Sequence, residues 1–365
     1  MKANTLKALP ANPHLYEGEQ LVRIGHHQAM YRFVPGKADR AMIVCVPGNS
    51  HLARIFYGHP GGRVEDFLAH WVSQAGHPFL AVSYPLAHPV YSEPAPGFTI
   101  SDWGDQVAAI IVHVTKTHGL SAPVIAAGWS MGAKIASSLG RAARAHDTEI
   151  AMFAALAGDP PIPGTVPARG VASLALGRDG YADRRSLYDW FLGSIADQGA
   201  SIGHTIIPKD TYLADFLGPI PVNLILSGQV YRNGALVPDL AQAIEDAGSF
   251  DFNNYPFPVC LHGTSATDFH NVLFNPSAWS FIRSRLLADR LLGAREPSEL
   301  SEGEWAALQV QLKLSETDFT ERVEGNHAFF VGQPGARQTV EKILSLYDRV
   351  RRLPRAPVPT PRTAR

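Results

Sequence analysis

The sequence predicts an α/β fold with a doubly wound, mostly parallel central sheet. Short, continuous apolar segments alternate along the chain with stretches whose apolar residues recur at helical spacing. This alternation is the pattern of parallel strands joined by crossover helices. It stops near position 160 and resumes near position 257, so we expect an insertion there that caps the sheet.

The N-terminal part of the chain contains the first predicted strands. Residues 21–24 and 29–34 flank Gly25 and predict a hairpin. Residues 42–46 and 79–82 are uninterrupted apolar runs, which are typical of strands buried on both faces of a sheet.

Two helices are predicted between and after these strands. Residues 64–72 carry apolar side chains at i, i+3 and i+4 spacing, and Gly76 ends that stretch. Thr99 and Asp102 stand three residues apart, as at a helix N-terminus, and Gly119 marks the expected end of the second helix.

The remaining core elements follow the same rules. Strands are predicted at 124–127, 150–156, 259–261 and 319–323, on continuous apolar runs. Apolar residues at helical spacing predict a helix directly after the first of these strands, over 135–139. They also predict helices that follow the third and fourth strands, over 279–287 and 340–347.

These elements divide the chain into four segments. Residues 1–159 and 257–350 are expected to form the two parts of the core, and residues 160–256, which are rich in Gly and Pro, the cap or lid insertion. Residues 351–365 combine Arg and Pro without an acidic residue, so we expect a disordered basic tail.

Composition limits the partners of this protein. The formal net charge is −1, which predicts no attraction to nucleic acid or to an anionic membrane. No apolar run is long enough for a membrane span or an export signal, so a cytoplasmic location is expected. Cys45 and Cys260 lie in apolar runs and are expected to be buried thiols. Cysteine-based metal motifs are absent, so neither a metal nor an organic cofactor is expected.

One short motif indicates a catalytic serine. Residues 128–132 match Gly-x-Ser-x-Gly, with a predicted strand before Ser130 and a predicted helix after it. That context is what a nucleophile elbow requires, because a sharp strand-to-helix turn lifts the hydroxyl above the sheet. Residues 199–203 match the same motif around Ser201, but no strand precedes them. Ser130 is therefore the predicted nucleophile.

A serine nucleophile needs a base, and the base needs an acid that orients it. In the chain order serine, acid, histidine, the base follows the last strand, where His327 lies in a short polar loop. The acid is expected after the preceding strand, which gives Asp268; Asp159, after the strand at 150–156, is the alternative.

The oxyanion formed during attack needs backbone N–H donors that are already in place. One donor is expected from Met131, the residue after the nucleophile. The other is expected from the loop after the strand at 42–46, and Asn49 is the candidate through its main chain.

Together these segments resemble the α/β-hydrolase superfamily, which contains lipases, esterases and thioesterases. The resemblance extends over about residues 21–350 outside the insertion, and residues 325–330 are similar to a loop of acyl thioesterases. Two features depart from the family pattern. Pro47-Gly48 stands where many members have His-Gly, and the interval from Asp268 to His327 is long enough to require an extra helix near 302–312.

The resemblance implies a serine hydrolase that cleaves an ester or thioester of an apolar acyl group through an acyl-enzyme intermediate. Trp190 and Phe216 in the insertion are candidates to contact a small-molecule or carrier-bound acyl substrate. The alternatives are an acyltransferase with the same triad, a non-catalytic ligand-binding protein of this fold, and a serine peptidase. Fold alone does not choose among them, and the sequence leaves the oligomeric state open.

Overall fold

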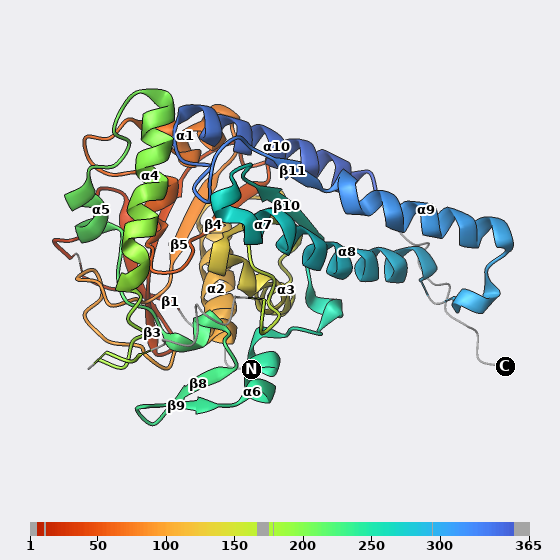
Figure 1. Cartoon of the computed structure of the whole chain (residues 1–365), viewed down its shortest axis with the longest axis horizontal. Helices are drawn as coiled ribbons and strands as arrows, with labels where there is room; N and C mark the ends of the chain where they lie inside the picture. The colour runs from red at the N-terminus through yellow and green to blue at the C-terminus, as the bar shows by residue number, and fades with distance from the viewer. Residues whose placement is uncertain (1–5, 11, 166–174, 178, 294, 354–365) are drawn as a thin grey trace.

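The computed structural model shows a central twisted sheet with helices on both faces (Figure 1). It describes residues 6–10, 12–165, 175–177, 179–293 and 295–353.

Within these described residues the central sheet has nine strands, in the order β1-β2-β3-β5-β4-β6-β7-β10-β11. The strands from β1 to β5 in this order pair antiparallel, and those from β5 to β11 pair parallel. Their bounds are β1 (Leu6–Ala8), β2 (Glu19–Ile24), β3 (His27–Val34), β4 (Met42–Val46), β5 (Phe79–Ser83), β6 (Val124–Trp129), β7 (Ile150–Leu156), β10 (Pro258–His262) and β11 (Thr320–Arg322).

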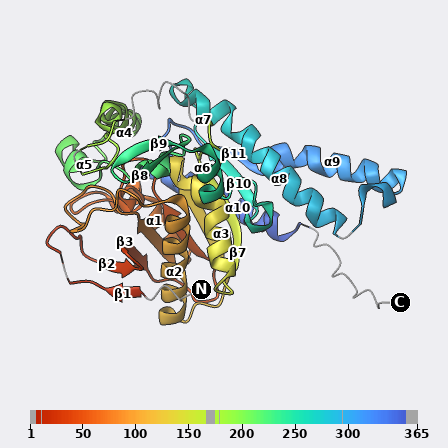
Figure 2. The same cartoon turned by 90° about the horizontal axis from the view of Figure 1, so that it is seen from below.

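Helices cover both faces of the sheet because its central strands are apolar on both sides (Figure 2). Alternate residues of β4 belong to two separate core clusters. One cluster includes side chains of α2 (Ile100–His118) and α3 (Ala136–Arg144), and the other includes side chains of α1 (Leu68–Gln74) and α10 (Gln333–Arg351). This arrangement confirms the predicted doubly wound sheet.

A cap is inserted between β7 and β10. Its described elements are α4 (Tyr188–Ile202), α5 (Lys209–Asp215), the hairpin β8 (Gln229–Arg232) with β9 (Ala235–Pro238), and α6 (Leu240–Ala247). The antiparallel edge, the parallel centre and this insertion together give the α/β-hydrolase fold with a cap. The boundaries at 160 and 256 stay a prediction.

A helical hairpin between β10 and β11 projects from the body of the molecule (Figures 1 and 2). After the short α7 (Phe269–Leu273), helix α8 (Asn275–Leu292) runs beside α9 (Glu302–Asp318). The extra helix expected near 302–312 is therefore present, and it is longer than predicted.

One strand was missed, and two local predictions need correction. Strand β1 was not predicted, because its three residues lack an apolar run and are mostly exposed. The helix expected over 64–72 begins only at Leu68, because Phe67 has an extended backbone that separates α1 from the 3-10 turn η2 (Val64–Asp66). Helix α10 includes Arg351, which we assigned to the tail, and residues 354–365 lie outside the described part of the chain.

Other sequence features are placed as predicted. Thr99 and Asp102 form a capping box at the start of α2, and Gly119 ends this helix with a φ of 61°. Cys45 and Cys260 are buried free thiols, and burial raises the pKa of Cys260 to about 11. Across the described residues, every helix is too short or too polar to cross a bilayer.

Candidate active site

Ser130 stands on a tight turn between β6 and the 3-10 turn η3 (Ser130–Ile135), which leads into α3. Its φ of 51° lies in the left-handed region, where the backbone of a residue other than glycine is strained. Such strain concentrates at functional sites. The turn is possible because glycines stand where other chain segments approach it most closely, at Gly48 and Gly132. A Cβ on Gly132 would lie 2.5 Å from the Pro47 carbonyl oxygen, and one on Gly48 would lie 2.9 Å from the Cβ of Ser130.

The second Gly-x-Ser-x-Gly match has a different environment. Ser201 lies in the last turn of α4, where its hydroxyl donates to the Gln198 carbonyl at 2.7 Å. It does not line the cavity that contains Ser130. The structure therefore gives the two motifs different local folds, and only the one at Ser130 is a strand-to-helix turn.

His327 and Asp268 lie against each other although they come from different loops. Asp268 ends the 3-10 turn η8 (Ala266–Asp268) after β10, and His327 follows β11. Nδ1 of His327 is 3.0 Å from Oδ2 of Asp268, and both side chains are at most 5% exposed. The backbone of His327 is also held, because Trp129 Nε1 donates to its carbonyl at 3.0 Å.

A neighbouring amide network orients the Asp268 carboxylate, and the carboxylate in turn determines which ring nitrogen of His327 carries the proton. Asn275 Nδ2 donates to Asn271 Oδ1 at 2.6 Å, so the amide nitrogen of Asn271 faces Asp268 and donates to Oδ1 at 2.6 Å. Oδ2 of Asp268 then accepts from Nδ1–H of His327. In this tautomer Nε2 keeps its lone pair, which is what a general base requires.

Asp159, the alternative acid, has other partners. It accepts from Asn275 Nδ2 at 2.9 Å, and its second carboxylate oxygen is 3.7 Å from the ammonium nitrogen of Lys134. The contacts of the described residues thus bring Asp268, and not Asp159, to His327.

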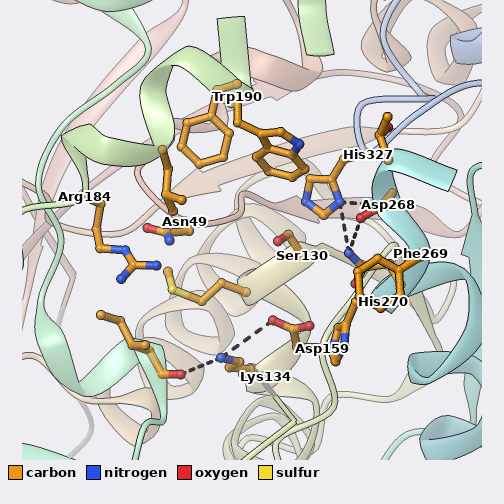
Figure 3. Close-up of a pocket in the computed structure, with 16 residues that line it drawn as sticks. Asn49, Ser130, Lys134, Asp159, Arg184, Trp190, Asp268, Phe269, His270 and His327 are labelled. Carbon is orange, nitrogen blue, oxygen red and sulfur yellow. Dashed lines mark hydrogen bonds and ion pairs between the residues drawn. The ribbon is translucent and has the colours of Figure 1, made fainter. Parts of the chain in front are cut away.

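Ser130, His327 and both carboxylates line one cavity of about 350 Å³ (Figure 3). Figure 3 shows Ser130 below the imidazole ring of His327. Both residues belong to the described part of the chain, and no hydrogen bond joins them. Catalytic hydrogen bonds are often long in unliganded enzymes and shorten when substrate binds, so this geometry is compatible with proton transfer after binding.

Asn49 and Met131, the predicted oxyanion donors, line the same cavity. The loop that carries Asn49 is fixed by His51, whose Nδ1–H donates to the Asn49 carbonyl at 2.6 Å. Nε2 of His51 accepts from the Tyr212 hydroxyl at 2.6 Å. Burial lowers the pKa of His51 to about 3, so this ring is neutral. The role of the two backbone amides stays a prediction.

Aromatic side chains of α4 form one wall of the cavity. Trp190 and Phe191 line it, and the Trp190 ring centroid is 4.9 Å from that of His327. Phe216, the other aromatic candidate for substrate contact, is fully buried and does not line this cavity. Its packing against Tyr212 and His59 makes it a core residue of the cap.

Sequence reasoning missed several polar residues of this site. Lys134 and Arg184 line the cavity, and Asn271 and Asn275 connect its two carboxylates. A lysine one turn after the predicted nucleophile, among small apolar residues, was a signal that could have been used. For the two asparagines, the only signal in the sequence was their i, i+4 spacing. The described residues contain no group of three or more His, Cys, Asp or Glu side chains suited to a metal ion.

No protein-family model matches the sequence, and no curated protein matches it. Solved structures do. A thermophilic esterase from Thermogutta terrifontis is 11% identical, with a TM-score of 0.47 over 88% of this chain and 94% of its own. A monoglyceride lipase from Saccharomyces cerevisiae is 14% identical, with a TM-score of 0.46 over 91% and 94%. A thioesterase domain from the curacin biosynthetic pathway is 12% identical, with a TM-score of 0.38 over 91% and 98%.

Proposed function

We propose that this protein is a serine hydrolase that cleaves an ester or thioester through an acyl-enzyme intermediate. Ser130 is the nucleophile, His327 the general base and Asp268 the acid that orients it. One observation carries the proposal: a buried His–Asp pair, 3.0 Å apart, faces the same cavity as a serine on a strained strand-to-helix turn. A His–Asp pair activates a serine hydroxyl when the imidazole comes within hydrogen-bond reach of it.

The reaction begins when the Ser130 oxygen attacks the carbonyl carbon and Nε2 of His327 accepts the hydroxyl proton. A C–O bond forms, and the carbonyl π electrons move to the oxygen, which accepts from the backbone amides of Met131 and Asn49. The tetrahedral intermediate then expels an alkoxide or thiolate, which takes the proton from Nε2. Water repeats these steps on the acyl-enzyme, so that a carboxylic acid leaves and Ser130 regains its proton.

The cavity supports a substrate with an apolar acyl group. Leu187, Trp190 and Phe191 contribute apolar surface from the cap, and a cavity of about 350 Å³ is of the size that holds a small molecule. The substrate is a free ester or thioester, or the acyl end of a carrier-bound one. The absence of nucleic-acid and membrane partners and the cytoplasmic location remain predictions.

Replacing the nucleophile tests the proposal. Wild type is expected to react with a fluorophosphonate probe and to hydrolyse members of a panel of acyl esters and thioesters of equal acyl length. Ser130→Ala is expected to lose the labelling and roughly 10³-fold or more in kcat. Ser201→Ala is the matched control, because it removes the serine of the other Gly-x-Ser-x-Gly match, whose hydroxyl contacts a helix carbonyl.

The same assays distinguish the rival functions. Product analysis with a competing alcohol or amine separates hydrolysis from acyl transfer, and a peptide substrate tests for a peptidase. A wild-type protein that neither reacts with the probe nor turns over any ester would contradict the proposal and favour a ligand-binding protein.

A further inference from the structure

A charged pair occupies the cavity on the side of Ser130 opposite the aromatic wall. Lys134 lies on η3, one turn after the nucleophile, and Asp159 follows β7. Both line the cavity with Ser130. Figure 3 shows the pair below Ser130 and Trp190 above it, so the cavity has one apolar wall and one charged wall.

Lys134 is buried to a degree that is unusual for a lysine. Its side chain is 2% exposed and that of Asp159 is 14% exposed. Burial lowers the pKa of Lys134, and the nearby charge of Asp159 opposes that shift. A charged side chain costs more free energy to bury than an apolar one of similar length, so the fold alone would favour methionine at this position.

Among the described residues, one acceptor lies within hydrogen-bond range of the Lys134 ammonium group. One of its three N–H donors goes to the Ile225 carbonyl at 2.6 Å. The distance to the Asp159 carboxylate is 3.7 Å, which is beyond the usual range of a direct hydrogen bond. The other oxygen of that carboxylate is already bonded to Asn275. Lys134 and Asp159 therefore present a donor and an acceptor side by side.

We propose that Lys134 and Asp159 form a subsite that binds a hydroxyl group of the substrate. The inference rests on the proposed function, because it concerns the substrate of the same cavity. A hydroxyl can both accept from an ammonium and donate to a carboxylate through a single small group. An apolar substituent would cover the pair without a hydrogen bond to either member, and a carboxylate would lie against the negative charge of Asp159.

Matched esters test the proposal. On the acyl side, ethyl 3-hydroxybutyrate is compared with ethyl butyrate. On the alcohol side, 2-hydroxyethyl butyrate is compared with propyl butyrate. One of the two hydroxylated esters is expected to have a kcat/KM on the order of 10-fold above that of its partner, as for a hydrogen bond to a charged group. The pair that shows the preference identifies which part of the substrate carries the hydroxyl.

Two variants connect this preference to the subsite. Lys134→Met removes the donor, and Asp159→Asn removes the acceptor charge with little change in shape. In each variant the ratio of the two rates is expected to fall toward one. Because the ratio compares two substrates on the same protein, a general loss of activity cancels. If Lys134→Met does not fold, Asp159→Asn carries the test.

Binding to the Ser130→Ala variant, measured by titration calorimetry with the same ester pairs, needs no turnover and separates this inference from the proposed function. A binding preference without hydrolysis by wild type would support the subsite and contradict the enzyme. The inference is overturned if wild type shows no preference for either hydroxylated ester, if both variants keep the preference, or if monoethyl succinate is preferred. The last result would indicate an anion site that includes Arg184, which also lines this cavity.

Discussion

At the scale of single residues, Asn271 fixes the orientation of the proposed catalytic acid. Its amide nitrogen donates to Oδ1 of Asp268 at 2.6 Å, and its carbonyl oxygen accepts from Asn275 at 2.6 Å. Asp268 is thus held at both oxygens, one by Asn271 and the other by His327. The general base depends on that carboxylate for its tautomer, so Asn271, which is not itself a member of the proposed triad, influences proton transfer.

Asn271→Ala is expected to lower kcat by about 10- to 100-fold with a much smaller change in KM. The carboxylate of Asp268 would lose one of its two hydrogen bonds and could rotate away from His327, whereas the cavity wall would change only at the truncated side chain. Steady-state kinetics on an ester substrate measures the two constants, and thermal unfolding reports on the fold.

The control for this prediction is Asn253→Ala, at an exposed position of the 3-10 turn η7 (Phe252–Asn254). This variant is expected to have the kcat and KM of the wild type within experimental error. A positioning role for Asn271 would be wrong if its replacement raised KM as much as it lowered kcat, or if the kinetic loss only followed a loss of folded protein.

Sequence reasoning identified those site residues whose role follows from their position directly after a predicted strand. Ser130 was chosen because a strand precedes it, and Asp268 because it follows the penultimate strand; the second choice is the one that lies against His327. Lys134 contacts the carbonyl of Ile225, which is remote in sequence, and Asn271 has a role only because its neighbour Asp268 meets His327 in the folded chain. No local pattern encodes such contacts, so these residues became visible only in the folded chain.

At the scale of elements, the turn around Ser130 depends on close backbone approach. The Cα of Gly132 packs against the loop after β4, and an added Cβ would lie 2.5 Å and 2.6 Å from the carbonyl oxygens of Pro47 and Val46. Backbone atoms cannot move aside as a flexible side chain can.

Gly132→Ala is expected to lower the free energy of unfolding by about 1–3 kcal/mol, because the added methyl group overpacks a rigid site. Gly193→Ala provides a matched control within α4, since nothing lies within 4 Å of the added Cβ. It is expected to raise stability by about 0.5–1 kcal/mol through helix propensity. Chemical denaturation measures both values, and a neutral Gly132→Ala would contradict the close packing.

The elements that sequence reasoning predicted best are those with a continuous apolar run. Strands β4 and β7 have the predicted bounds, because a strand buried on both faces needs apolar residues at every position. The cap was recognised only as a region that lacks this pattern. Its helices depend on packing against the core, as where the Leu52 amide donates to the Phe216 carbonyl at 2.8 Å, and such contacts leave no local periodicity.

At the scale of the whole molecule, two buried histidines join the core to α5 of the cap. His51 accepts from the Tyr212 hydroxyl at 2.6 Å, and Nε2–H of His88 donates to the Ala214 carbonyl at 2.9 Å. Burial lowers the pKa of His51 to about 3 and that of His88 to about 4. Both rings are neutral in the folded protein, and in the unfolded chain both protonate below the ordinary pKa of about 6.5.

These two pKa values predict that acid destabilises the protein through the interface between core and cap. Between about pH 6.5 and pH 4 the unfolded chain binds more protons than the folded one, so the free energy of unfolding falls as pH falls. From pH 7 to pH 5 each histidine should contribute about 2 kcal/mol to the loss in the free energy of unfolding.

In His51→Gln and in His88→Gln the total loss between these pH values should be smaller by about that amount, whatever the stability of the variant at pH 7. His146→Gln, at an exposed position, should keep the full wild-type loss. Urea denaturation at the two pH values decides the matter: equal losses in all four proteins would show that neither buried ring is linked to folding.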